Sequence, residues 1–148
     1  MQTQRLLQLR AVPNTKTSEA AVLPALRIEP GDAASWPVRA LVEELDAYLA
    51  SLYPPESNHL VPVDALRQPN VVFLTAWLGD VLAGCGAVLD QDGQFAEMKR
   101  MYVRPDYRGA GVGRAILDAL AAAARSRGLR RLCLETGVAQ PEALALYE

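Results

Sequence analysis

Residues 108–114 read RGAGVGR, and this glycine-rich stretch decides how the rest of the chain is interpreted. A β-rich run, residues 95–103, precedes it, and an amphipathic segment, residues 111–127, follows it. Glycines let the backbone turn tightly and approach a ligand closely. The helix that follows begins with unpaired N–H groups and a positive dipole end, which suits an anion such as a pyrophosphate. Arg108 and Arg114 can add charge-assisted contacts, although a glycine-rich turn without a ligand is the plain alternative.

The kind of phosphate ligand is narrowed by what the stretch lacks. A Walker A loop continues with Lys and Ser or Thr, whereas Gly113 is followed by Arg and Ala. A dinucleotide fingerprint counted from Gly111 and Gly113 needs Gly or Ala where Ile116 stands. Glu135 nevertheless imitates the ribose-binding acid of that fold, so a nucleotide-binding module stays open as an alternative.

The remaining segments alternate between strand-like and helix-like patterns. We expect strands at residues 25–28, 71–78, 81–89, 95–103 and 131–135, and helices at 37–48, 63–66, 111–127 and 141–148. This order predicts a mixed α/β fold, a sheet flanked by helices. Residues 1–22 are expected to be a flexible N-terminal extension to one domain, residues 23–148.

Composition narrows the class of protein. The 148 residues suit one domain, and 51% hydrophobic with 22% charged residues is typical of a globular chain. A net charge of −2 gives no basic excess that would indicate nucleic acid as a partner. Cys85 and Cys133 lack zinc-site spacing, so we expect no metal and two free, buried thiols in a reducing, cytoplasmic setting. No run approaches the ~18 apolar residues of a membrane span, so no membrane partner is expected.

The spacing Arg108-x-x-Gly111-x-Gly113 resembles the coenzyme A signature of the GNAT superfamily of N-acyltransferases, which reads Arg/Gln-x-x-Gly-x-Gly/Ala. The flanking segments are similar to the family's fourth strand and its turn, its fifth strand, and the helix that carries its tyrosine: residues 99–105, 132–135 and 143–148. Residues 52–59 and 134–137 further resemble small, poorly characterised bacterial members of that superfamily.

The resemblance implies a mostly antiparallel mixed sheet whose fourth and fifth strands splay apart to admit acetyl-CoA. It implies that Met101 and Val103 offer backbone groups to the pantetheine and the thioester carbonyl. The pyrophosphate is implied to lie on the turn formed by Arg108, Gly109, Ala110, Gly111, Val112, Gly113 and Arg114. The implied reaction is direct attack of a primary amine on the thioester in a ternary complex, so positioning supplies much of the rate.

The same resemblance assigns the proton transfers. Tyr147 matches the family's general acid, although by composition alone it is an aromatic residue on an apolar helix face. Glu97 matches the base of some members, and its alternative is a strand-edge carboxylate paired with Lys99. The acceptor, a small-molecule or peptide amine, is expected at a loop that contains Tyr53, Glu56 and His59, all of which are also ordinary loop residues.

The family pattern continues past the helix at 141–148 with two further strands, and here the chain stops at Glu148. Without them one sheet edge is expected to be open, and an open edge together with family habit predicts a homodimer. A non-catalytic sensor that binds acyl-CoA and regulates a partner is an alternative function. A damaged acid or base would favour it, but Glu97 and Tyr147 are both present.

Overall fold

A computed structural model describes residues 2–8, 25–53 and 62–137 of the chain, with side chains described for 25–53 and 62–133. The described residues form strands β1 (Gln2–Gln8), β2 (Leu26–Pro30), β3 (Val71–Leu78), β4 (Val81–Gln91), β5 (Phe95–Val103) and β6 (Arg131–Gly137), helices α1 (Val38–Leu52) and α2 (Val112–Ser126), and 3₁₀ turns η3 (Val63–Arg67) and η4 (Pro105–Tyr107).

The strands form one sheet in the order β1-β6-β5-β4-β3-β2. The pairs β2–β3, β3–β4 and β4–β5 are antiparallel. Strands β5 and β6 run parallel, because α2 carries the chain back across the sheet between them. The mixed α/β fold with a mostly antiparallel sheet is therefore confirmed.

Most of the predicted elements are found close to their predicted bounds. Strand β5 matches residues 95–103 in full, and β4 runs two residues past its predicted end, to Gln91. Helix α1 continues beyond residue 48 to Leu52, because Leu49 still packs against the core on its side of the sheet. The helix expected at 141–148 lies outside the described residues. Within the described part of the chain, no helix has the length and apolar character to cross a bilayer.

The first residues differ from the expectation of a flexible extension. Gln2–Gln8 is strand β1, which pairs antiparallel with β6 from Gln2 opposite Gly137 to Gln8 opposite Arg131. Over residues 2–8 the expectation is wrong, because a strand of this kind is specified by its partner's free edge rather than by its own sequence pattern. Residues 9–22 lie outside the described residues. The β1–β6 pairing covers the edge of β6 that was expected to be open, which removes that argument for a homodimer.

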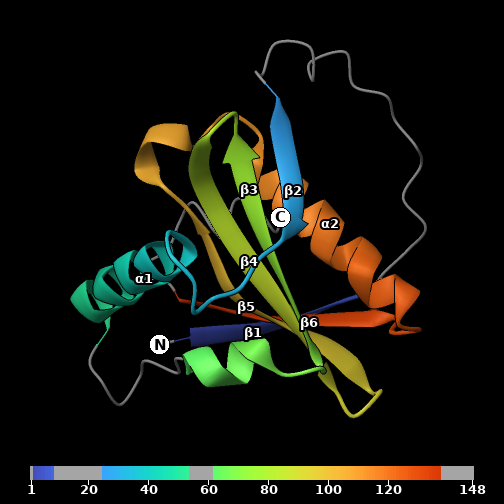
Figure 1. Ribbon diagram of the computed structural model, residues 1–148. Coiled ribbons are helices and arrows are strands. Elements are labelled where there is room, and N and C mark those ends of the chain that lie inside the picture. The colour runs from blue at the N-terminus through green and yellow to red at the C-terminus, as the bar shows by residue number, and fades with distance from the viewer. Residues whose placement is uncertain (1, 9–24, 54–61, 138–148) are drawn as a thin grey trace.

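Two hydrophobic cores cover the two faces of the sheet. Helix α2 packs on one face, where its fully buried Ile116 and Leu120 meet strand residues such as Leu74 and Met98. Helix α1 packs on the other face, around Leu41 with its neighbours on β3 and β4. In Figure 1 the two helices lie on either side of the central strands. Cys85 and Cys133 are buried thiols outside any disulfide, as expected.

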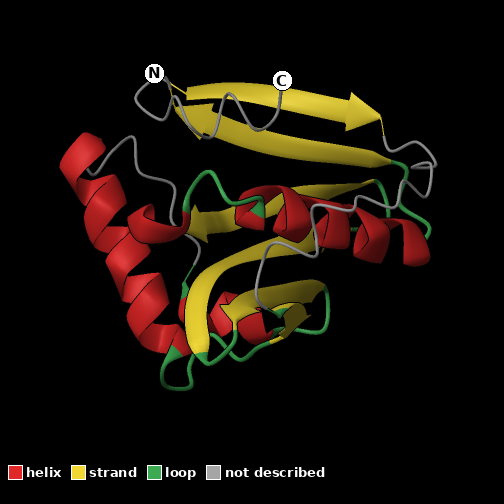
Figure 2. Cartoon of the chain, turned by 90° about the horizontal axis from the view of Figure 1, so that it is seen from above, coloured by secondary structure: helices red, strands yellow, loops and turns green. Residues whose placement is uncertain are grey.

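Strands β5 and β6 separate soon after they meet. Their parallel register covers only Ala96, Met98 and the residue between them on β5. Beyond Met98 the rest of β5 pairs, among the described strands, with β4 alone. Figure 2 shows the β1–β6 pair set apart from the other strands. The splayed strands that the resemblance implies are therefore present at the second half of β5.

Candidate active site

The glycine-rich turn follows directly from β5. After η4 the chain passes through Gly109 and Gly111, whose φ values of +81° and +86° lie in the region that favours glycine. Helix α2 begins at Val112, and no side chain caps its N-terminus at Gly111. Its first internal hydrogen bond runs from the N–H of Ala115 to the carbonyl of Gly111 at 3.0 Å. The first N–H groups of a helix have no carbonyl partner within the helix, so this end of α2 suits an anion.

The surroundings of this turn leave room for an anion. A Cβ placed on Gly109 or Gly111 would meet no other heavy atom within 4 Å. Backbone donors and the positive end of the helix dipole act together at this point. Arg114 is exposed in the first turn of α2 and adds a positive charge. Residues 109–114 therefore fit the pyrophosphate role that the resemblance implies.

The Arg108 side chain contacts two other elements of the fold. Its Nε donates a hydrogen bond to the carbonyl oxygen of Val103 at 2.8 Å. Its guanidinium lies 5.7 Å from the ring centroid of Tyr48 and 5.6 Å from that of Tyr102. A cation over aromatic faces is favourable, so this side chain links the turn to α1 and β5. Its expected contact with the phosphates stays a prediction.

The second half of β5 brings Met101 and Val103 to the point where β6 has diverged. Both side chains are half-buried and pack against the core under α2. Their backbone groups therefore border the gap between β5 and β6, on the same strand that leads into the turn. The backbone role expected of both residues stays a prediction.

Glu97 lies near the start of β5, opposite Leu89 of β4 and next to Cys133 of β6. Its Oε1 accepts a hydrogen bond from Nε2 of Gln91 at 3.0 Å. The described partner of the carboxylate is thus Gln91 rather than Lys99. Leu89 packs on the core beside α1, and cross-strand partners share a face, so Glu97 lies on the α1 face.

A polar cluster that sequence reasoning missed joins α1 to the end of β5. The hydroxyl of Tyr102 donates to Oε2 of Glu44 at 2.9 Å, and Nε of Arg104 lies 3.4 Å from Oε1 of the same carboxylate. Nη1 of Arg104 donates to the carbonyl of Leu82 at 2.9 Å. Burial is the larger cause, and the hydrogen bond to Glu44 the second, of a rise in the pKa of Tyr102 to about 12. The only sequence signal was the four-residue spacing of Glu44 and Tyr48, which places both on one side of α1.

A cavity of about 530 Å³ opens at this cluster. It lies between α1 and the connection from β5 to α2 and is lined by Glu44, Tyr102, Arg104, Pro105, Asp106 and Tyr107. Tyr102 stands between Met101 and Val103 in sequence, on the opposite face of β5. The cavity therefore reaches the same part of β5 as the gap, from the α1 side.

The remaining predicted site residues fall in different places. Tyr53 ends α1 and is 7% exposed, so it is a buried residue of the helix terminus rather than part of an open loop. Glu56, His59 and Tyr147 lie outside the described residues.

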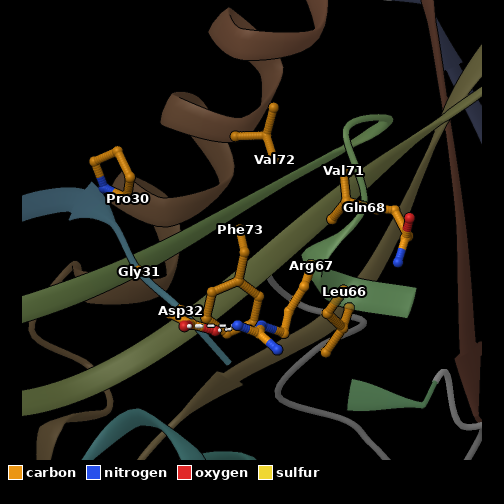
Figure 3. Close-up of a pocket in the computed structure, with 9 residues that line it drawn as sticks. All are labelled: Pro30, Gly31, Asp32, Leu66, Arg67, Gln68, Val71, Val72 and Phe73. Carbon is orange, nitrogen blue, oxygen red and sulfur yellow. Dashed lines mark hydrogen bonds and ion pairs between the residues drawn. The ribbon is translucent and has the colours of Figure 1, made fainter. Parts of the chain in front are cut away.

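A second cavity, of about 450 Å³, lies beside η3 and the loop after β2 (Figure 3). Its charged side chains are paired with each other: Nε of Arg67 lies 3.0 Å from Oδ1 of Asp32. Val71 in its wall pairs with Leu89, which pairs with Glu97, so the cavity lies at the end of the sheet where β5 begins. The glycine turn is at the other end, and this cavity is not part of it.

Comparisons with known proteins also indicate an acyltransferase. A model of the Acetyltransferase (GNAT) family matches residues 38–148. An IAA acetyltransferase of Azospirillum brasilense is 47% identical over 108 residues, which are 72% of this chain and 71% of that protein. A solved structure of an acyl-CoA N-acyltransferase from Klebsiella pneumoniae matches with a TM-score of 0.67 and 33% sequence identity. The match covers 82% of this chain and 79% of that protein's chain.

A more distant structure supports the fold alone. It is a GNAT family acetyltransferase from Elizabethkingia anophelis with acetyl-CoA bound, at a TM-score of 0.58 and 18% identity, covering 82% of this chain and 72% of its own. The family match, the splayed strands and the glycine turn agree with one another, and they do not favour the alternative of a nucleotide-binding module of another fold. The chain belongs to the Acetyltransferase (GNAT) family and is an acyl-CoA-dependent N-acyltransferase.

Proposed function

We propose that the chain transfers the acetyl group of acetyl-CoA to a primary amine by direct attack within a ternary complex. The observation that carries this proposal is the continuity of β5 with the glycine turn. One strand supplies Met101 and Val103 beside the gap and then leads into the uncapped start of α2. A pantetheine arm along β5 would thereby place its pyrophosphate on residues 109–114 and its thioester near the middle of the strand.

The amine must be neutral to attack, and the departing thiolate needs a proton. We assign the first task to Glu97, directly or through water, because its carboxylate lies on the α1 face of β5. We assign the second to Tyr147, on the family match alone. As the C–N bond forms and the C–S bond breaks, the amine's proton goes to Glu97 or water, and the sulfur receives one from Tyr147.

The amine acceptor is proposed to approach from the α1 side. The cavity at Glu44 and Tyr102 reaches β5 from this face, and the segment with Glu56 and His59 follows α1 in the chain. Glu44 offers a half-exposed carboxylate, with 42% of its side chain exposed, which favours an acceptor with a positive charge. The acceptor is a small molecule or a peptide end.

The test is coenzyme A release from acetyl-CoA with a panel of amines, comparing the wild type with Tyr147→Phe and Glu97→Gln. Amine-dependent release is expected, reduced about tenfold or more by Tyr147→Phe because general acid catalysis contributes at least that much. Glu97→Gln is expected to lower the rate less, since water can replace the base. Binding of acetyl-CoA without amine-dependent release would instead favour the sensor function, and no binding at all would refute the proposed co-substrate.

A further inference from the structure

Strand β5 contains an extra residue at the level of the gap. Lys99 lies opposite Ala87 and Tyr102 lies opposite Cys85, so Arg100 and Met101 together face the single residue between those partners on β4. This is a β-bulge, and bulges redirect the side chains that follow them. Without the bulge, strict alternation along β5 would place Arg100 and Tyr102 on the α2 face instead of Met101 and Val103.

The consequence of the bulge is visible in the two cores. Ala96 and Met98 before it pack on the α2 side, and Met101 and Val103 after it pack on the same side. Tyr102 packs on the α1 side. The bulge therefore sets which way the backbone of β5 faces where β6 has separated from it.

Arg100 forms this bulge at an unfavourable backbone angle. Its φ is +57°, a left-handed conformation that is unfavourable for a residue with a Cβ. Glycine would adopt it freely. The chain instead places here a long, charged side chain that is only 4% exposed. Such strain persists only where surrounding contacts hold it.

Contacts from α1 and β4 hold Arg100. Nη1 of Arg100 forms an ion pair with Oδ1 of Asp46 on α1. The thiol of Cys85 on β4 lies 3.3 Å from the carbonyl oxygen of Arg100 and donates to it. Burial raises the pKa of the Cys85 thiol to about 12, so it keeps its proton at neutral pH. Side chain and backbone of the same residue are thus held at once.

We propose that Arg100 and Asp46 are positioning residues, whose ion pair ties the bulge of β5 to α1 and fixes the backbone of residues 101–103 beside the gap. The expected effect on catalysis rests on the function proposed above, because that function places the thioester beside the backbone of residues 101–103. Neither side chain needs to touch a substrate. Arg100 is buried, whereas 36% of the Asp46 side chain is exposed. An ion pair with a desolvated partner adds little net stability compared with apolar packing, so stability alone does not account for it.

The test combines kinetics with amide hydrogen exchange in the full chain. The variants are Asp46→Asn, Arg100→Gly and Arg100→Lys. The control is Glu43→Gln, which breaks an exposed ion pair with Arg39 on the same helix. Asp46→Asn and Arg100→Gly are expected to lower kcat about tenfold or more, since a displacement near 1 Å can cost that much. The dissociation constant of coenzyme A should change less than about threefold.

Hydrogen exchange keeps the proposal testable even if turnover is absent. In Asp46→Asn and Arg100→Gly the amides of residues 99–103 should exchange about tenfold faster, while those of β3 stay unchanged. Arg100→Lys, which can still pair with Asp46, should restore both readouts toward the wild type. Unchanged hydrogen exchange and unchanged kcat in Arg100→Gly would overturn the proposal. The backbone would then keep its position without the ion pair, and glycine would only relieve the strain at this φ. A parallel loss of kcat, coenzyme A affinity and protection throughout the sheet would overturn it too, as general destabilisation.

Discussion

The hydroxyl of Tyr102 on β5 donates a hydrogen bond to Oε2 of Glu44 on α1 at 2.9 Å, and this bond joins the helix to the strand beside the gap. Tyr102→Phe removes the donor and keeps the ring. The free energy of unfolding is expected to fall by about 1 kcal/mol, because a bond to a half-exposed carboxylate is worth roughly that much. Urea denaturation measures it, with Glu43→Gln as the control on the same helix. Equal stability of Tyr102→Phe and wild type would show that the bond contributes nothing net.

The same pair predicts a high-pH titration. Burial and the bond to Glu44 raise the pKa of Tyr102 to about 12, above the ordinary value of 10. The stabilisation linked to this shift is fully present below pH 10 and is lost as the pH rises through about 12. The absorbance at 295 nm of wild type minus that of Tyr102→Phe should show a midpoint near 12, and Glu44→Gln should lower it. A wild-type midpoint near 10, with circular dichroism unchanged, would contradict the prediction.

Gly111→Glu tests the anion site. The substitution forces a side chain onto a φ of +86° and puts a negative charge beside the start of α2. Binding of coenzyme A, measured by calorimetry, is expected to weaken at least about a hundredfold, through lost space and charge repulsion. Gly79→Glu is the matched control, because Gly79 has a φ of +58° and equally open surroundings in the β3–β4 turn. Similar weakening in both variants would mean that only general strain had been measured.

Gly84→Ala tests the close approach of β4 and β5. A Cβ at Gly84 would lie 2.6 Å from the carbonyl oxygen of Tyr102, and backbone cannot move aside easily. We expect a loss of about 1–3 kcal/mol in the free energy of unfolding. Gly93→Ala, at a φ of +73° with nothing within 4 Å, reports the cost of backbone strain alone. If Gly84→Ala is no more destabilising than Gly93→Ala, the two strands adjust at little cost.

The parts of the site that could be predicted from the sequence are those whose structure is determined by residues close together in the chain. The turn at residues 108–114 was recognisable because glycine spacing, a preceding strand and a following helix all act within a short segment. Strand β5 was bounded correctly for the same reason. The direction of the Arg108 side chain was not predictable, since it depends on Tyr48 and Tyr102, which the fold brings together at a centroid distance of 6.2 Å.

The features that sequence reasoning missed depend on partners far along the chain. The run from Phe95 to Val103 reads as an unbroken strand, and nothing in it marks Arg100 as a bulge. The bulge follows from the pairing with β4 and the ion pair with α1. Strand β1 was missed because residues 2–8 (QTQRLLQ) show no strict alternation and require the edge of β6. Glu44 was one acidic residue among several until α1 was placed over Tyr102.

The pairing of β1 with β6 also has a consequence for the order in which the molecule assembles. Gln2 lies opposite Gly137, so this ladder closes a loop that contains nearly all of the described chain. The hairpins from β3 to β5 close short loops, and short loops form faster and at a lower entropic cost. The central strands with α1 and α2 should therefore fold first, and the β1–β6 ladder should dock last. The β1–β6 side of the gap between β5 and β6 is then completed only in the final folding step. A chain can therefore be largely native before it can catalyse acyl transfer.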